Sequence, residues 1–259
     1  QMCIRDRSIA SEPTVPIVIG ESHTSTFYPI RGFVNNVAIF NTTLDPTAIT
    51  ALYNNGQPET TISSSPVSWW KLDNTTTGIQ DSIGSNNGTI VGTVPEIQTN
   101  VWTPRLNADS DTLPSTALVS SDLQFNSAYS SFSLDFDGTD DIDCTNSSVL
   151  DITGSISISC WIKSSNTGAN RKIIVKDDGG SNRSFQINAN HASNGPYTYF
   201  WLQGNIKGVS TGVPNQIVDG NWHHVVSVFK SGEYIRMYID GVQAGNTNVT
   251  ETTLDSCLL

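Results

Sequence analysis

Apolar and polar residues alternate along much of this chain with the two-residue period of a β-strand. The clearest case is residues 155–163, where isoleucine or cysteine fills every even position and serine, tryptophan or lysine every odd one. Residues 132–138 show the same alternation. Further strand-like runs lie at residues 15–20, 30–41, 67–72, 172–176, 184–189, 197–203, 222–230 and 233–240. Short strands that recur about every 8–12 residues, with turn residues between them, predict an all-β sandwich or barrel.

Two local patterns predict how individual strands are oriented and connected. Phe33, Val37 and Ile39 share one face of the run 30–41 if that strand is regular. Asp240-Gly241 lies between apolar flanks and predicts a hairpin turn, because glycine adopts a positive φ at little cost.

One segment follows the helical period instead. Asp45 suits an N-cap and Pro46 suits the first helical position. The apolar residues that follow keep helical spacing until Asn55-Gly56 ends the pattern. The sequence therefore predicts one short helix near residues 45–54.

Composition narrows the class of partner. Of the 259 residues 14% are charged, and serine, threonine, asparagine and glycine are abundant, which suits strands joined by turns. The net charge of −11 would repel a phosphate backbone, so nucleic acid is not an expected partner. No run approaches the roughly 20 apolar residues of a membrane span, so membrane insertion is not expected. The acidic balance fits a secreted or calcium-collecting protein, and equally a charge that serves solubility alone.

The two ends differ in character from the regions that they flank. Residues 1–7 can be back-translated to a DNA sequence that resembles the transposon adapter of sequencing libraries, and residues 256–259 to its opposite strand. We interpret both as adapter translation, and both boundaries as accidents of sampling. Cys144 and Cys160 then remain in strand-like runs and are predicted to be buried free thiols, with a disulfide between them as the alternative. No CxxC or HxxxH spacing indicates a zinc site.

Several segments, taken in order, resemble the laminin-G-like jelly rolls of the concanavalin A-like lectin and glucanase superfamily. They read VSWWKLD at residues 67–73, DSIG at 81–84, LDFDGTDDID at 134–143, ISCWIK at 158–163, DGNWHHV at 219–225 and YIDGV at 238–242. The resemblance covers most of residues 66–255. It implies an all-β fold, a two-sheet antiparallel jelly-roll β-sandwich.

Residues 14–58 resemble the C-terminal part of the same family, although they come first in this chain. We therefore predict that 8–58 is the end of a first repeat, 59–65 a linker, and 66–255 a second jelly roll that lacks its last strands. A jelly roll without these strands leaves an open sheet edge. Residues 14–58 are predicted to fill that gap as in a circular permutant, and detachment of 30–41 from the sheet containing 67–72 would refute this.

Catalysis is not expected. Glucan-hydrolysing relatives carry two glutamates on one strand in a Glu-x-Asp-x-x-Glu pattern, and retaining hydrolysis needs two carboxylates about 5 Å apart. The glutamates here are Glu12, Glu21, Glu59, Glu96, Glu233 and Glu251, and none are paired in that way. His223 and His224 follow one another on a predicted strand, which favours one inward and one outward ring with ordinary hydrogen bonds over a metal or catalytic site.

Two rows of residues are candidates for ligand binding. Tyr197, Tyr199 and Trp201 alternate on one strand, and Tyr234, Arg236 and Tyr238 alternate on another. Aromatic faces stack on sugars, and the concave sheet of this family often holds glycans. Half-buried aromatic rows also fill sandwich cores, so the alternative is a packing role.

Two acidic turns are candidates for calcium binding. Asp137, Asp140 and Asp141 cluster about one turn with Asp143, and Asp177-Asp178 precede two glycines. Calcium takes six to eight oxygen ligands, which loop carboxylates and carbonyls can supply. The alternative is that these aspartates are solvated turn residues.

These observations predict a non-catalytic recognition or adhesion module that is extracellular, at a cell or virion surface. Carbohydrate is the favoured ligand, a surface protein is another, and neighbouring laminin-G-like repeats are expected partners within the parent chain. The adapter-like ends suggest an environmental sample, where such repeats occur in bacterial surface proteins and phage structural proteins. The alternatives are a structural spacer without a ligand and, less favoured, a glycoside hydrolase.

Overall fold

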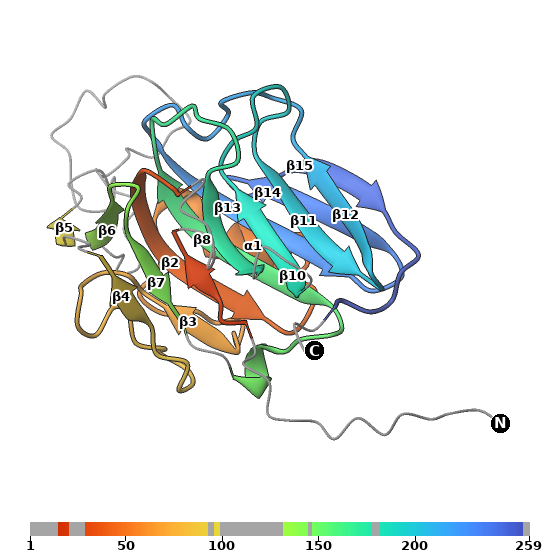
Figure 1. Cartoon of the computed structure of the whole chain (residues 1–259), viewed down its shortest axis with the longest axis horizontal. Helices are drawn as coiled ribbons and strands as arrows, with labels where there is room; N and C mark the ends of the chain where they lie inside the picture. The colour runs from red at the N-terminus through yellow and green to blue at the C-terminus, as the bar shows by residue number, and fades with distance from the viewer. Residues whose placement is uncertain are drawn as a thin grey trace, which may run out of the picture.

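The computed structural model describes residues 15–20, 29–92, 96–98, 132–144, 147–177 and 182–255. Both adapter-like ends and most of the weakly patterned segment 93–131 lie outside these residues. The described chain is all β apart from one α-helix and two short 3-10 turns, Asn54–Gly56 and Ser148–Leu150. Two antiparallel sheets stack face to face, as Figure 1 shows, which confirms the predicted jelly-roll sandwich.

The first sheet has seven strands. In spatial order they are β12 (Asn205–Ser210), β11 (Tyr197–Leu202), β10 (Arg183–Asn188), β9 (Lys172–Asp177), β1 (Val18–Ile19), β7 (Asp141–Asp143) and β4 (Thr89–Val91). The second sheet has eight strands. Seven follow the order β15 (Val242–Asn248), β14 (Tyr234–Ile239), β13 (Trp222–Lys230), β8 (Ile156–Lys163), β2 (Gly32–Phe40), β6 (Phe132–Phe136) and β5 (Glu96–Gln98), and β3 (Ser68–Trp70) pairs with β2.

The main core lies between the sheets and is filled by alternate residues of each strand. The even-numbered positions of β8 all enter it, as their pattern predicted. Phe200 from the seven-stranded sheet meets Phe229 from the other, with ring centroids 5.8 Å apart. Cys144 and Cys160 are buried in this core as free thiols, which confirms that prediction and rules out the alternative disulfide between them.

A helix covers the outer face of the eight-stranded sheet. The helix α1 spans Pro46–Tyr53, and the Asp45 carboxylate caps it by accepting a hydrogen bond of 2.8 Å from the backbone N–H of Ala48. Ile49 and Leu52 are buried in a second apolar cluster with outward-facing residues of β2 and β13. The predicted helix is therefore confirmed, and it closes part of this face to solvent. No described helix is long and apolar enough to cross a membrane.

The N-terminal segment is built into both sheets. Strand β2 lies between β8 and β6 and also pairs with β3, while β1 lies between β9 and β7. Residues 32–40 therefore belong to the same sheet as residues 68–70 (Figure 1). Their other neighbours in that sheet, β6 and β8, come much later in the chain. The assignment of these segments to different repeats stays a prediction.

A bulge in β2 reverses the alternation that the sequence suggested. The register against β8 shifts between Asn35 and Ala38, and Asn36 adopts a φ of 49°. Val37 and Ile39 consequently face the core, whereas Phe33 lies on the outer face. The prediction that all three share a face was wrong, because it assumed a regular strand. The predicted Asp240-Gly241 turn is confirmed, since both residues have positive φ, 51° and 79°.

Candidate ligand-binding surfaces

Three aromatic side chains form a row on the outer face of the seven-stranded sheet. The intervening residues Phe200 and Leu202 belong to the core, so Tyr197, Tyr199 and Trp201 point away from it. The first two rings are 4.9 Å apart between centroids and tilted by 59°, and the second pair is 6.5 Å apart in an edge arrangement at 75°. We call these three residues the aromatic ladder.

The middle ring of the aromatic ladder is the accessible one. Tyr199 is 36% exposed, against 5% for Tyr197 and 8% for Trp201. On the adjacent strand β12, a Cβ at Gly208 would lie 2.2 Å from the Tyr199 ring, so the ring lies across that strand only because residue 208 is glycine. Ile206 pairs with Trp201 on the same strand and is 54% exposed. Together they form a continuous apolar surface at the edge of the sheet.

Polar groups frame the aromatic ladder on its other side. The Tyr197 hydroxyl donates a hydrogen bond of 2.8 Å to Asn170 Oδ1, and the Arg183 guanidinium lies 5.4 Å from the Trp201 ring centroid. Asn188 pairs with Tyr197 across β10 and β11, and its side-chain oxygen and nitrogen are both buried without a hydrogen-bond partner. A buried amide in this state is costly, which makes it unusual beneath an ordinary surface.

The second predicted row lies on the opposite side of the sandwich. Tyr234 and Tyr238 are on the outer face of the eight-stranded sheet, and Tyr238 is buried in the cluster beneath α1. The Arg236 guanidinium lies 3.7 Å from the Tyr234 ring centroid and its Nε donates a hydrogen bond of 2.9 Å to Asn246 Oδ1. The two rows therefore do not converge on one site, and Tyr238 has the packing role that was the alternative.

The described calcium candidates lie in the turn between β6 and β7, at the start of β7 and at the end of β9. Asp137 accepts hydrogen bonds from the Thr139 backbone and hydroxyl, at 2.8 and 2.6 Å, and these lower its pKa. Asp140 is buried and accepts a hydrogen bond from the Asp137 backbone, and Asp141 begins β7. Asp177, on β9, pairs with an arginine at 3.2 Å.

No three His, Cys, Asp or Glu side chains in the described residues are placed so that they could hold a metal ion. Asp178 lies outside the described residues. Calcium binding stays a prediction.

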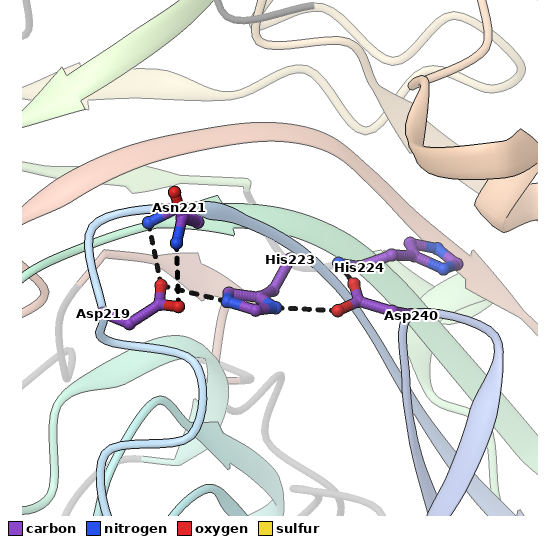
Figure 2. A network of polar contacts seen from close by, with 5 residues as sticks. All are labelled: Asp219, Asn221, His223, His224 and Asp240. Atoms are coloured by element: carbon purple, nitrogen blue, oxygen red, sulfur yellow. Dashed lines mark hydrogen bonds and ion pairs between the residues drawn. The ribbon is translucent and has the colours of Figure 1, made fainter. Parts of the chain in front are cut away.

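His223 joins two loops at one end of the second sheet (Figure 2). Its Nδ1 lies 2.8 Å from Asp240 Oδ2 and its Nε2 lies 3.1 Å from Asp219 Oδ1, while Asn221 also donates to Asp219. Asp240 in turn accepts a hydrogen bond from the His224 backbone. Burial alone would lower the pKa of His223, but the hydrogen bonds and charges of both aspartates raise it overall. This network holds the Asp240 turn against the loop that precedes β13.

His224 points away from that network and faces the helix, as the alternation predicted. Its ring lies between Trp161 and Tyr53, at centroid distances of 4.9 and 6.1 Å, and its Nε2 is 2.8 Å from Ser159 Oγ. Burial lowers the pKa of His224 to about 3, so the ring is neutral at physiological pH. Its role is in packing beneath the end of α1.

The sequence did not indicate a cleft of about 590 Å³ that opens beside β2, β6 and the end of β8. We call it the rim cleft, and its lining includes Arg31, Phe33, Asp135, Lys163, Asn166 and Gly220. The assumption of a regular strand put Phe33 on the same face as Val37 and Ile39, so its place in the lining of the rim cleft was overlooked.

The fold is an antiparallel jelly-roll sandwich in which a helix covers part of one outer sheet face and the other outer face carries the aromatic ladder, with Tyr199 as its exposed ring. Residues 136–257 match a family model described as the concanavalin A-like lectin/glucanases superfamily. This match supports a laminin-G-like domain over residues 136–257 and confirms the resemblance for the motifs that lie within them. Comparison with curated proteins and with solved structures gave no match.

Proposed function

We propose that this chain is a non-catalytic recognition module that binds neutral glycans on the aromatic ladder. The observation that carries the proposal is the placement of the Tyr199 ring, which lies against Gly208 while the residue stays 36% exposed to solvent. Sugar rings present apolar C–H faces that pack on aromatic faces, while their hydroxyls need polar partners nearby. The aromatic ladder combines both, with Ile206 extending the apolar surface.

The polar surroundings favour a hydroxyl-rich ligand. The Asn170 side chain accepts the hydrogen bond of the Tyr197 hydroxyl at one end of the aromatic ladder, and the Arg183 guanidinium lies beside Trp201 at the other end. Hydrogen bonds to sugar hydroxyls through such groups, direct or bridged by water, are the usual source of glycan specificity.

Two glutamates of the described residues are engaged in ion pairs. Glu251 lies 2.9 Å from Lys207 on β12, and Glu233 lies 2.8 Å from Lys230. A retaining hydrolase needs a nucleophile and an acid facing the same bond, a role for which paired surface glutamates are poorly suited. We therefore favour binding over hydrolysis, in an extracellular adhesion protein of a cell or virion surface.

The proposal is tested by glycan-array screening followed by calorimetry on the unaltered protein, Tyr199→Ala and Tyr199→Phe. Removal of the ring is expected to weaken binding about two- to twelvefold from the loss of stacking alone, because aromatic stacking contributes roughly 0.5–1.5 kcal/mol beyond the buried area. Tyr199→Phe keeps the ring and is expected to bind as the unaltered protein does. Tyr234→Ala, on the opposite face, is the matched control for loss of a tyrosine.

Equal affinities for Tyr199→Ala and the unaltered protein would contradict the aromatic ladder as the site. Running each titration in calcium and in chelator tests the calcium prediction in the same experiment. If neutral glycans bind under neither condition, the structural spacer becomes the better reading.

A further inference from the structure

Four side chains of alternating character cross the outer face of the eight-stranded sheet at the rim cleft. Asp135 pairs with Phe33, Phe33 with Lys163, and Lys163 with Trp222, so the row runs over β6, β2, β8 and β13. The Phe33 and Trp222 ring centroids are 6.3 Å apart, and the Lys163 ammonium lies 5.9 Å from the Phe33 centroid. An apolar wall and fixed charges thus share one opening.

The floor of the rim cleft is held rigidly. Gly32 has a φ of 140°, and a Cβ there would lie 2.2 Å from the Lys163 carbonyl oxygen, so β2 and β8 approach more closely than a side chain would allow. The Ser164 hydroxyl donates to the Arg31 carbonyl at 2.5 Å and accepts from the Asn166 backbone at 3.1 Å. The Gly220 N–H donates to the Ser164 carbonyl at 2.9 Å. These bonds fix three segments of the lining relative to one another.

The rim cleft brings charges of both signs together in an acidic protein. The chain carries 13 lysines and arginines against 24 acidic residues, and two of the basic side chains, Arg31 and Lys163, line this opening. Within the described residues neither makes an ion pair, although the charge of Arg31 helps to lower the pKa of Asp137 on the neighbouring turn. Burial, together with the charges of Asp137 and Asp140, raises the pKa of Asp135.

We propose that the rim cleft is a second binding site, specific for a carboxylated sugar such as a uronic acid unit of a polysaccharide. A pyranose ring over Phe33 packs its C–H face on the aromatic wall. Its carboxylate then reaches Lys163, and its hydroxyls reach Asp135 on the far side. Neighbouring strands are about 4.8 Å apart, so the two charged residues stand about 10 Å apart, which accommodates one sugar ring with its carboxylate. This site is independent of the aromatic ladder on the opposite sheet.

The test uses trigalacturonate and its methyl ester, which carries no charge, as paired probes in calorimetric titrations at low salt. The unaltered protein is expected to prefer the acid to the ester. Lys163→Met and Ser165→Asp are each expected to weaken binding of the acid about tenfold. Ser165 is exposed and lines the opening, so its replacement adds a repelling carboxylate without disturbing the core.

Lys71→Met is the matched control, because the Lys71 ammonium also lies over an aromatic ring, 4.9 Å from the Trp69 centroid, but outside the rim cleft. It is expected to bind trigalacturonate as the unaltered protein does. Equal binding of acid and ester, unchanged binding by Lys163→Met and Ser165→Asp, or no binding of the acid at all would overturn the proposal.

Tyr199→Ala separates this site from the aromatic ladder. If that change removes trigalacturonate binding, the acid binds on the aromatic ladder and the rim cleft is not its site. If the rim-cleft variants lose the acid while no neutral glycan binds the unaltered protein, the second site stands and the proposed function of the aromatic ladder fails.

Discussion

Asp81 is the residue whose removal is expected to damage the fold most for its size. The residue as a whole is 7% exposed, and its carboxylate accepts five hydrogen bonds. The donors are the Ser68 hydroxyl at 2.8 Å, the Asn86 amide at 3.0 Å, and the backbone N–H groups of Trp69, Ile83 and Asn86 at 3.0, 3.1 and 3.2 Å. It therefore fastens β3 to the turn-rich segment that follows it.

The cost of Asp81→Ala can be worked from these donors. Four of them belong to the buried residues Ser68, Trp69 and Asn86. The two backbone N–H groups among these, of Trp69 and Asn86, are fixed in place and would lose their partner without access to water. At about 1–3 kcal/mol for each buried unsatisfied donor, the expected destabilisation is about 3–4 kcal/mol. Asp81→Asn keeps one acceptor but turns an NH₂ group toward donors, so it is expected to recover less than half of this loss.

Urea unfolding followed by tryptophan fluorescence measures the effect. With a slope of about 3 kcal/mol per molar urea, Asp81→Ala is expected to lower the midpoint by about 1 M. Asp73→Ala is the control, because Asp73 accepts its one described side-chain hydrogen bond from the neighbouring Asn74. A shift for Asp81→Ala no larger than that of Asp73→Ala would refute the reasoning.

The same carboxylate predicts a dependence on acid. Burial alone would raise the pKa of Asp81, but the hydrogen bonds from Trp69, Gly84, Ile83 and Ser68 lower it below 3.8. Its contribution to stability is therefore present above pH 3.8 and is lost as the pH falls through the folded pKa. The stability difference between the unaltered protein and Asp81→Asn is expected to narrow below pH 3.8.

Three further predictions concern a histidine, a glycine and the thiols. The pKa of His223 is raised, so the stabilising effect of its ring is complete below pH 6.5 and is lost as the pH rises through the folded pKa. The melting temperature of His223→Gln should therefore lie further below that of the unaltered protein at about pH 5.5 than at about pH 9. Gly32→Ala places a Cβ 2.2 Å from a backbone carbonyl at a positive φ, and a destabilisation above about 3 kcal/mol in urea is expected, whereas Gly154→Ala meets nothing within 4 Å and should be neutral. Burial raises the pKa of Cys160 to about 12 and also raises the pKa of Cys144. Mass spectrometry should therefore find neither thiol labelled by a thiol reagent until the protein unfolds. Labelling of either thiol in the native protein would contradict their burial.

The strongest local patterns predicted the elements that lie at the centre of the structure. The alternation over residues 155–163 fixed both the strand β8 and its core-facing positions, because this strand lies between two others and is covered on both faces. The Asp45 and Pro46 signals placed the helix to within a residue of its observed start. Where local chemistry and tertiary burial agree, a pattern alone is enough.

Edge strands were missed because little of their surface is buried. β12 and β15 read NIKGVS and VQAGNTN and lie at the ends of the two sheets, where only one neighbouring strand fixes each of them. Their polar and glycine-rich sequences carry almost no alternation. The glycines have structural roles, as Gly208 accommodates the Tyr199 ring, but such roles depend on a contact with another strand.

Periodicity also could not place the two aromatic rows relative to each other. It predicted that the residues within each row share a face, and they do, yet it carried no information on which sheet or side each strand would join. The rim cleft could not be predicted from the sequence for a similar reason. Its row of side chains depends on strand neighbours that are distant in sequence and on the one-residue shift at Asn36.

The rim cleft also couples ligand binding to the assembly of the sheet. Phe33 and Gly32 come from the segment that precedes residues 59–65, whereas Asp135, Lys163 and Trp222 come from strands well after it. The site exists only while β2 is inserted between β8 and β6. A ligand that contacts Phe33 and Lys163 together, as proposed, would bind the inserted state alone. By mass action it would stabilise that insertion more strongly as its concentration rises above its dissociation constant. Because β2 comes from far along the chain, ligand binding at the rim cleft and the insertion of β2 into the second sheet are consequently linked equilibria.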